Sequence, residues 1–165
     1  MSQLDCNTPR GRAFIGRQNH VIDACCAAWQ CDGARTPDTT DSPIDVLFYR
    51  AGELRAVAEV KTRDLTFEGL QRFGSYLVTL DKIEHGRRLA AELRTPYFFV
   101  VGLIDAIVYW RLASADRRWQ WEIEFSCRAT ITAATCNGGS AERANAYLSL
   151  AQMKYIRRPD AAKDG

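Results

Sequence analysis

The chain has 165 residues, of which 47% are apolar and 25% charged, and its formal net charge is +2. This composition is typical of a soluble globular protein, and the length predicts one domain over residues 1–165. Its core is expected at about 14–125 and a frayed tail at about 157–165. No long apolar run and no secretory leader pattern are present, so we expect no membrane span and a cytoplasmic location. The small net charge neither requires nor excludes a nucleic-acid partner.

The first predicted element is a helix that begins at Thr8 and Pro9 and runs to about residue 30. Thr8 suits a helix cap and Pro9 suits the first turn. Apolar residues then recur at helical spacing, and Gly16 could divide the helix in two. They are Phe14, Ile15, Ile22, Cys25, Cys26 and Trp29. We expect this stripe to pack on the core.

Residues 32–42 are dense in turn-forming residues and predict a loop that delivers the chain to Asp45. Asp38 and Asp41 lie in this loop. Their carboxylates could approach a metal ion, but side chains that cap their own backbone turn are the commoner arrangement.

The next stretch predicts two short strands joined by a tight turn. Residues 44–50 are rich in β-branched and aromatic residues, and residues 54–61 are apolar at alternate positions. Between them, residues 51–53 have turn character and predict a three-residue loop.

This loop length decides which side chains meet. If Arg50 faces Leu54, then Asp45 lies opposite Glu59, and cross-strand partners share a face about 5 Å apart. Lys61 is two residues beyond Glu59 and shares that face. A two-residue loop would shift the pairing by one and break the arrangement.

The predicted patch therefore holds two carboxylates and one ammonium group. Paired carboxylates form a hard, oxygen-rich site that suits Mg²⁺ or Mn²⁺. A metal ion there could polarise a phosphodiester and lower the pKa of a bound water. Lys61 could orient that water or stabilise charge in the transition state. The alternative is a surface hairpin whose ion pairs are solvated.

Two helices and a buried strand are predicted after the hairpin. Residues 70–80 carry apolar side chains at helical spacing. Asp81 and Glu84 suit the start of a second helix, which Thr95-Pro96 ends. Residues 97–104 are almost wholly apolar and predict a central strand covered on both faces.

The C-terminal part predicts further strands, with one ambiguity. Residues 107–112, 119–125 and 128–135 read as strands, and residues 137–140 as a loop. The following segment, residues 141–153, could be a helix, or residues 147–150 could form a closing strand.

The sequence resembles the PD-(D/E)xK nuclease superfamily, in its RecB-like or phage-type members. Pro43-Ile44-Asp45 matches the first half of the motif, with one residue inserted, and Glu59-Val60-Lys61 matches the second. The element order over residues 14–104 is the α-β-β-α-β order of that family. The resemblance implies an α/β, restriction-endonuclease-like fold, in which a mixed β-sheet is flanked by helices and followed by additional C-terminal strands. It also implies that Asp45 and Glu59 bind the metal ion and that Lys61 is catalytic.

Further side chains fit the resemblance loosely. In RecB-like members a His on the first helix joins the metal, which His20 would match, with Gln18 as the competing polar group. Gln71 and Tyr76 are similar to a Gln-and-Tyr motif of those members, although their spacing is one residue longer. Lys82 opens a helix, as a Lys does in phage-type members, and would contact DNA.

The six cysteines are expected to be reduced thiols. Some members of the superfamily hold an iron–sulfur cluster with one Cys before the nuclease core and three after it. Here the distribution differs and no Cys-x-x-Cys pair occurs, which disfavours such a cluster. Four cysteines precede the core and two follow it, namely Cys6, Cys25, Cys26, Cys31, Cys127 and Cys136.

The resemblance implies a Mg²⁺- or Mn²⁺-dependent nuclease that hydrolyses DNA phosphodiesters in phage or bacterial DNA processing, recombination or repair. No sequence-reading module is evident, so specificity for DNA structure or for a partner is favoured. A homodimer would supply the two sites that duplex cleavage needs. The alternatives are an inactive nuclease-fold protein that acts in DNA binding or assembly, and an unrelated ligand-binding α/β domain.

Overall fold

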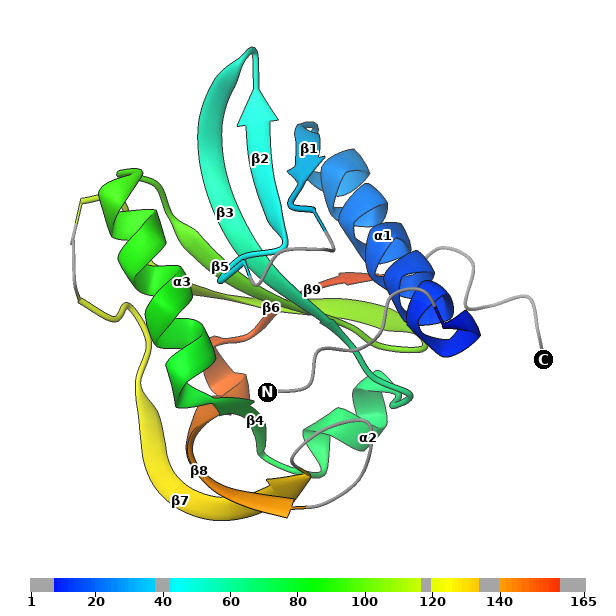
Figure 1. Cartoon of the computed structure of the whole chain (residues 1–165), viewed down its shortest axis with the longest axis vertical. Helices are drawn as coiled ribbons and strands as arrows, with labels where there is room; N and C mark the ends of the chain where they lie inside the picture. The colour runs from blue at the N-terminus through cyan, green and yellow to red at the C-terminus, as the bar shows by residue number, and fades with distance from the viewer. Residues whose placement is uncertain (1–7, 38–41, 117–119, 134–139, 158–165) are drawn as a thin grey trace.

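The computed structural model describes residues 8–37, 42–116, 120–133 and 140–157, and the account below concerns these residues. A six-stranded mixed sheet has the strand order β1-β2-β3-β5-β6-β9, and a three-stranded sheet has the order β4-β8-β7 (Figure 1). The elements in chain order are α1 (Pro9–Trp29), β1 (Asp32–Arg35), β2 (Val46–Arg50), β3 (Glu53–Thr62), α2 (Phe67–Gln71), β4 (Ser75–Thr79), α3 (Leu80–Glu92), β5 (Tyr97–Gly102), β6 (Ala106–Ala113), β7 (Phe125–Ala133), β8 (Ser140–Ser149), the 3₁₀ turn η1 (Leu150–Gln152) and β9 (Lys154–Arg157). No helix in this part of the chain is long and apolar enough to cross a membrane.

Helix α1 begins where the sequence predicts. The Thr8 hydroxyl accepts a hydrogen bond from the Gly11 N–H at 3.0 Å, and Pro9 occupies the first turn. The helix runs unbroken through Gly16 and ends at Gln30, whose φ of 52° is left-handed. A left-handed residue commonly ends a helix and turns the chain back, here into β1.

The hairpin of β2 and β3 differs from the prediction in its turn but not in the pairing that matters. Arg50 pairs with Glu53, so the loop contains only Ala51 and Gly52, both with positive φ. A shift in the pairing follows between Phe48 and Tyr49, where β3 contains one extra residue. Such a bulge offsets the register by one residue.

The bulge restores the register that a three-residue loop would have given. Phe48 pairs with Ala56 and Val46 pairs with Ala58, so the next step along both strands brings Asp45 to Glu59. The predicted loop length is therefore wrong, and a second irregularity cancels its effect.

Two helices cover opposite faces of the six-stranded sheet (Figure 1). Helix α1 packs on the face that includes Ala58 and Val60 of β3. Helix α3 and the three-stranded sheet pack on the other face, in a core that includes Val57 and Phe99. Because side chains alternate along a strand, Glu59 and Lys61 of β3 face the α3 side.

Several predicted elements are wrong. Residues 32–35 form β1 rather than a loop, because they pair with β2. Residues 70–80 do not form one helix: α2 ends at Gln71 and β4 begins at Ser75. The left-handed Gly74 separates them. Helix α3 begins at Leu80, where Thr79 makes no side-chain capping bond.

The C-terminal predictions were mixed. Tyr97–Gly102 is the buried central strand that was predicted, and β6 matches the strand that follows it. The strand predicted at 119–125 is absent from the described residues of that segment, and β7 begins at Phe125. Residues 140–149 form the strand β8, so the helix alternative for 141–153 is wrong. The predicted 137–140 loop and the tail beyond 157 fall mostly outside the described residues.

Candidate active site

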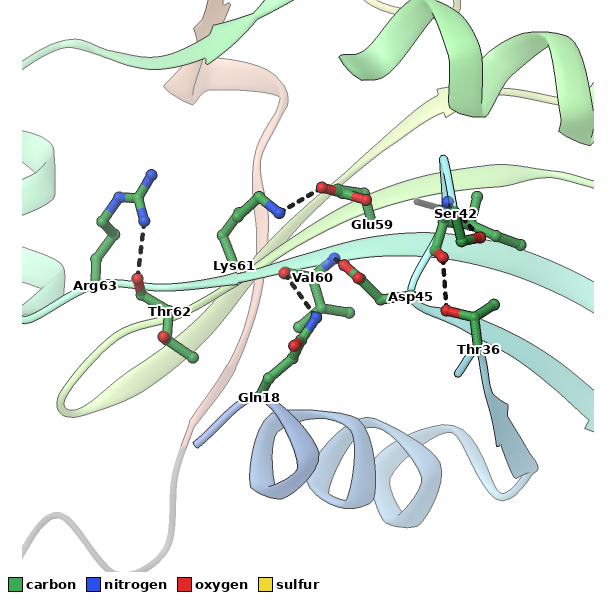
Figure 2. Close-up of polar contacts among 10 residues, drawn as sticks. Gln18, Thr36, Ser42, Asp45, Glu59, Val60, Lys61, Thr62 and Arg63 are labelled. Atoms are coloured by element: carbon green, nitrogen blue, oxygen red, sulfur yellow. Dashed lines mark hydrogen bonds and ion pairs between the residues drawn. The ribbon is translucent and has the colours of Figure 1, made fainter. Parts of the chain in front are cut away.

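Asp45, Glu59 and Lys61 lie together where β2 and β3 begin their pairing (Figure 2). Parallel pairing places Glu59 beside Phe99 and Lys61 beside Val101 of β5. The site is therefore built on the middle of the sheet, which gives it a rigid base.

Asp45 is held at both its backbone and its side chain. Its N–H donates to the Ala58 carbonyl at 2.8 Å, and its carbonyl accepts from the Thr36 N–H at 2.9 Å. Its carboxylate Oδ2 accepts the Val60 N–H at 2.7 Å. The Thr36 hydroxyl also donates to the Ile44 carbonyl at 2.8 Å, so the end of β1 secures the segment that carries Asp45 (Figure 2).

Glu59 is the buried member of the site. Its side chain is 1% exposed, and its Oε1 accepts a hydrogen bond and ion pair from Lys61 Nζ. Its Oε2 is buried and has no hydrogen-bond partner among the described residues. Burial raises the pKa of Glu59 to about 6, against the opposing charge of Lys61, and the nearby Asp45 raises it further.

Lys61 is 27% exposed and completes the group. Burial lowers its pKa, but the negative charges of Glu59 and Asp45 outweigh that effect, so the pKa lies above the ordinary value. Lys61 therefore remains an ammonium ion near neutral pH and acts as a charge and hydrogen-bond donor rather than as a base.

Sequence reasoning missed Tyr97, which it assigned only to a buried strand. Tyr97 is fully buried, and its hydroxyl has no partner among the described residues. Burial and the charges of Glu59 and Asp45 raise its pKa well above the ordinary value, so it stays a neutral phenol. A Cβ at position 86 of α3 would lie 2.3 Å from the Tyr97 hydroxyl, so Gly86 makes room for the ring. Only the parallel register, which pairs Val57 with Tyr97, could have revealed this neighbour.

The structure brings Gln18 and Lys82 to the site. Gln18 Nε2 of α1 donates to the Val60 carbonyl at 3.2 Å, from the face opposite Glu59 (Figure 2). Lys82 is half-buried near the start of α3, and its charge lowers the pKa of Glu59. Both residues thus approach the same short segment of β3.

The structure leaves His20 and Gln71 elsewhere. His20 is exposed and lines a hollow of about 260 Å³ with Arg17 and Arg63. Gln71 is exposed at the end of α2, whereas Tyr76 is buried against Phe99. Asp38 and Asp41 lie outside the described residues.

The oxygen atoms of the site fit a hard divalent ion. Asp45 and Glu59 supply carboxylates, the Val60 carbonyl directly follows Glu59 in the chain, and Glu59 Oε2 is an unsatisfied buried acceptor. Within the described residues no group of three or more His, Cys, Asp or Glu side chains lies close enough to hold a metal ion. His20 therefore does not form a cluster with the two carboxylates, and a bound ion would complete its shell with water.

The family comparison matches the segment that contains this site. A family model described as "phage putative PDDEXK endonuclease" matches residues 17–124, which is more than half of the chain. The chain belongs to this family. The predicted resemblance and the α/β fold, with a mixed sheet flanked by helices and further C-terminal strands, are thereby confirmed. Membership of this PDDEXK family supports a nuclease role.

Comparison with solved structures finds a likeness of fold to a resolvase. The PDDEXK chain is similar to Hjc, a Holliday junction resolvase from the archaeal hyperthermophile Archaeoglobus fulgidus, with 14% sequence identity and a TM-score of 0.40. The match covers 55% of this chain and 74% of that chain. No curated protein matches the sequence.

Proposed function

We propose that the protein is a Mg²⁺- or Mn²⁺-dependent endonuclease that hydrolyses DNA phosphodiester bonds. The observation that carries the proposal is the buried Glu59 Oε2, which has no partner among the described residues and lies beside the charge of Asp45. An unsatisfied buried carboxylate oxygen is costly. A divalent cation at this position would satisfy it.

Asp45 and Glu59 would hold the ion through their carboxylates, with the Val60 carbonyl as a further oxygen ligand. When bound, a divalent ion polarises the phosphodiester and lowers the pKa of a coordinated water. The other steps fall to the residues of the chain itself. Lys61, which stays protonated, donates a hydrogen bond that orients the attacking water or stabilises negative charge on the phosphate.

The surrounding residues keep these groups in position. Gln18 donates to the Val60 carbonyl, and Asp45 accepts from the Val60 N–H, so the two peptide groups that flank the Val60 Cα are both fixed. A preorganised site lowers the cost of reaching the transition state, because the donors do not need to reorient.

We assign the protein to phage or bacterial DNA processing, recombination or repair, with DNA inside the cell as its substrate; the family description, which names a phage endonuclease, supports the phage assignment. A homodimer would provide two sites for the two strands of a duplex. The alternative is an inactive member of the family that binds DNA or acts in assembly.

The experiment is a cleavage assay with Mg²⁺ and with Mn²⁺ on plasmid, linear, nicked, single-stranded and four-way DNA. The proposal expects cleavage of at least one form, loss of cleavage in EDTA, and loss in a Lys61→Ala variant that keeps the wild-type circular dichroism spectrum. Absence of cleavage of every form with either metal would overturn it and favour the inactive, DNA-binding alternative.

A further inference from the structure

A patch of apolar side chains lies exposed next to the site. Phe73, in the turn between α2 and β4, is 69% exposed, and Leu77 of β4 is 38% exposed. Leu77 pairs across the strands with Tyr147 of β8, which is half-buried. Single exposed apolar residues are common on protein surfaces, whereas a group of them suggests a binding surface.

These three residues line one hollow. It has a volume of about 480 Å³, and Arg63 and Tyr76 also line it. A second hollow of about 610 Å³ shares Ser75 and Tyr147 with the first and includes Arg128.

Two arginines accompany the aromatic side chains. The Arg128 guanidinium lies 5.2 Å from the centre of the Tyr147 ring, and the Arg63 guanidinium lies 5.9 Å from that of Tyr76. Two acids line the hollows: Asp64 is paired with Arg17 at 2.7 Å, and the exposed Glu124 offsets part of the charge of Arg128. The surface thus offers positive charge beside apolar rings, which complements a ligand with a flat apolar face and negative charge.

The hollow lies near the candidate active site, at the end of β3 that carries Lys61. Arg63 directly follows β3, two residues beyond Lys61, and lines the hollow together with Tyr76. The charges of Arg63 and Lys61 both act on the Tyr76 hydroxyl and oppose the rise in its pKa that burial causes. A ligand here would therefore lie next to a phosphodiester bound at Asp45 and Glu59.

We propose that Phe73, Leu77 and Tyr147 bind an unpaired base of the DNA substrate, while Arg63 and Arg128 contact its phosphates. This inference rests on the proposed function and names the substrate class, which is DNA with unpaired nucleotides beside the cleaved bond. The bases of a continuous duplex stack on one another, so their faces are not free to contact a protein ring. An unpaired base has a free face, and its stacking on aromatic side chains tolerates any sequence.

The test measures binding without cleavage, by fluorescence anisotropy in EDTA. Three labelled DNAs are compared: a blunt duplex, the same duplex with a single-stranded tail, and that duplex with a tail of abasic nucleotides. The variant is Phe73→Ala, which should fold because the side chain is mostly exposed. The matched control is Ile131→Ala, which removes a 75% exposed side chain from β7 of the same sheet.

The expected result is that Phe73→Ala weakens binding of the base-containing tail by at least about fivefold, the lower end of measured stacking losses. Binding of the blunt duplex and of the abasic tail should change by less than about twofold, and Ile131→Ala should change none of the three. Equal weakening on all three DNAs, or no weakening on any, would overturn the inference.

The outcome is independent of the proposed cleavage, because no metal is present. A protein that cleaves blunt duplex normally but shows no Phe73 effect would refute the inference and leave the nuclease function intact. A protein that cleaves nothing but binds tailed DNA through Phe73 would refute the nuclease function alone.

Discussion

The carboxylate Oδ2 of Asp45 accepts a hydrogen bond from the backbone N–H of Val60, with 2.7 Å between the oxygen and the nitrogen. One oxygen of a proposed metal ligand thus fixes the backbone of the residue that carries another proposed ligand, the Val60 carbonyl. The same side chain therefore has a structural role and a chemical one, and substitutions can separate the two.

Asp45→Asn should separate these roles when it is compared with Asp45→Ala. An Asn oxygen can still accept the Val60 N–H, whereas Ala leaves that buried group without a partner, at a cost of about 1–3 kcal/mol. We expect Asp45→Asn to unfold in urea close to the wild-type midpoint and Asp45→Ala to unfold earlier. Both variants should lose metal-dependent cleavage. Equal destabilisation of the two variants would show that the hydrogen bond contributes little.

Glu59 should make the metal-free protein less stable as the pH rises. Its pKa is about 6 in the folded protein and about 4.5 in the unfolded chain, so the folded state binds more protons between these values. The free energy of unfolding therefore falls as the pH rises through this window, by about 2 kcal/mol in all.

The measurement compares wild type with Glu59→Gln by urea unfolding in EDTA from pH 4.5 to pH 7.5. Gln resembles the protonated acid, so it lacks this titration. We expect the stability of Glu59→Gln relative to wild type to increase with pH and to level off above about pH 7. A difference that stays constant or decreases over this range would contradict the assigned burial cost.

Ala51→Asn should stabilise the hairpin. Ala51 has a φ of 52° and Gly52 a φ of 79°, so both residues of the two-residue loop are left-handed. Asn-Gly is the preferred pair for such a turn, and Ala tolerates this conformation poorly. We expect the free energy of unfolding to rise by about 0.5–1 kcal/mol, with cleavage unchanged. The substitution Gly52→Ala serves as the opposite control and should destabilise.

The sequence was sufficient to predict that Asp45, Glu59 and Lys61 lie together, because alternation in residues 54–61 places Glu59 and Lys61 on one face. The two faces of β3 confirm the alternation, since Val57 packs in one core cluster and Ala58 and Val60 pack in the other. The route to the correct register could not be predicted, since the bulge beside Phe48 leaves no clear mark in residue type. The loop is one residue shorter than predicted, and the bulge adds one residue to β3, so the two differences cancel.

Pairing between distant segments explains two features that the sequence did not reveal, the strand β4 and the position of Tyr97. Residues 75–79 carry apolar side chains that suit a helix or a strand, and they form β4 because β8 pairs with them from 70 residues further along the chain. The parallel pairing of β3 and β5 places Tyr97 beside Val57, where the charge of Glu59 acts on its hydroxyl. Local periodicity contains no information about either contact.

Lys82→Gln should weaken DNA binding mainly through charge. Lys82 is half-buried at the start of α3, and its charge lowers the pKa of Glu59. It forms no salt bridge with a carboxylate of the described residues. If it contacts a phosphate of bound DNA, its removal should lower the dependence of log affinity on log salt concentration by about 0.9.

The measurement is duplex binding in EDTA at several salt concentrations, with Arg88→Gln, an exposed residue of the same helix, as control. We expect the slope to fall for Lys82→Gln and to stay near wild type for Arg88→Gln. An equal change in both variants would indicate a general effect of net charge, and an unchanged slope for Lys82→Gln would mean that Lys82 acts on Glu59 rather than on DNA.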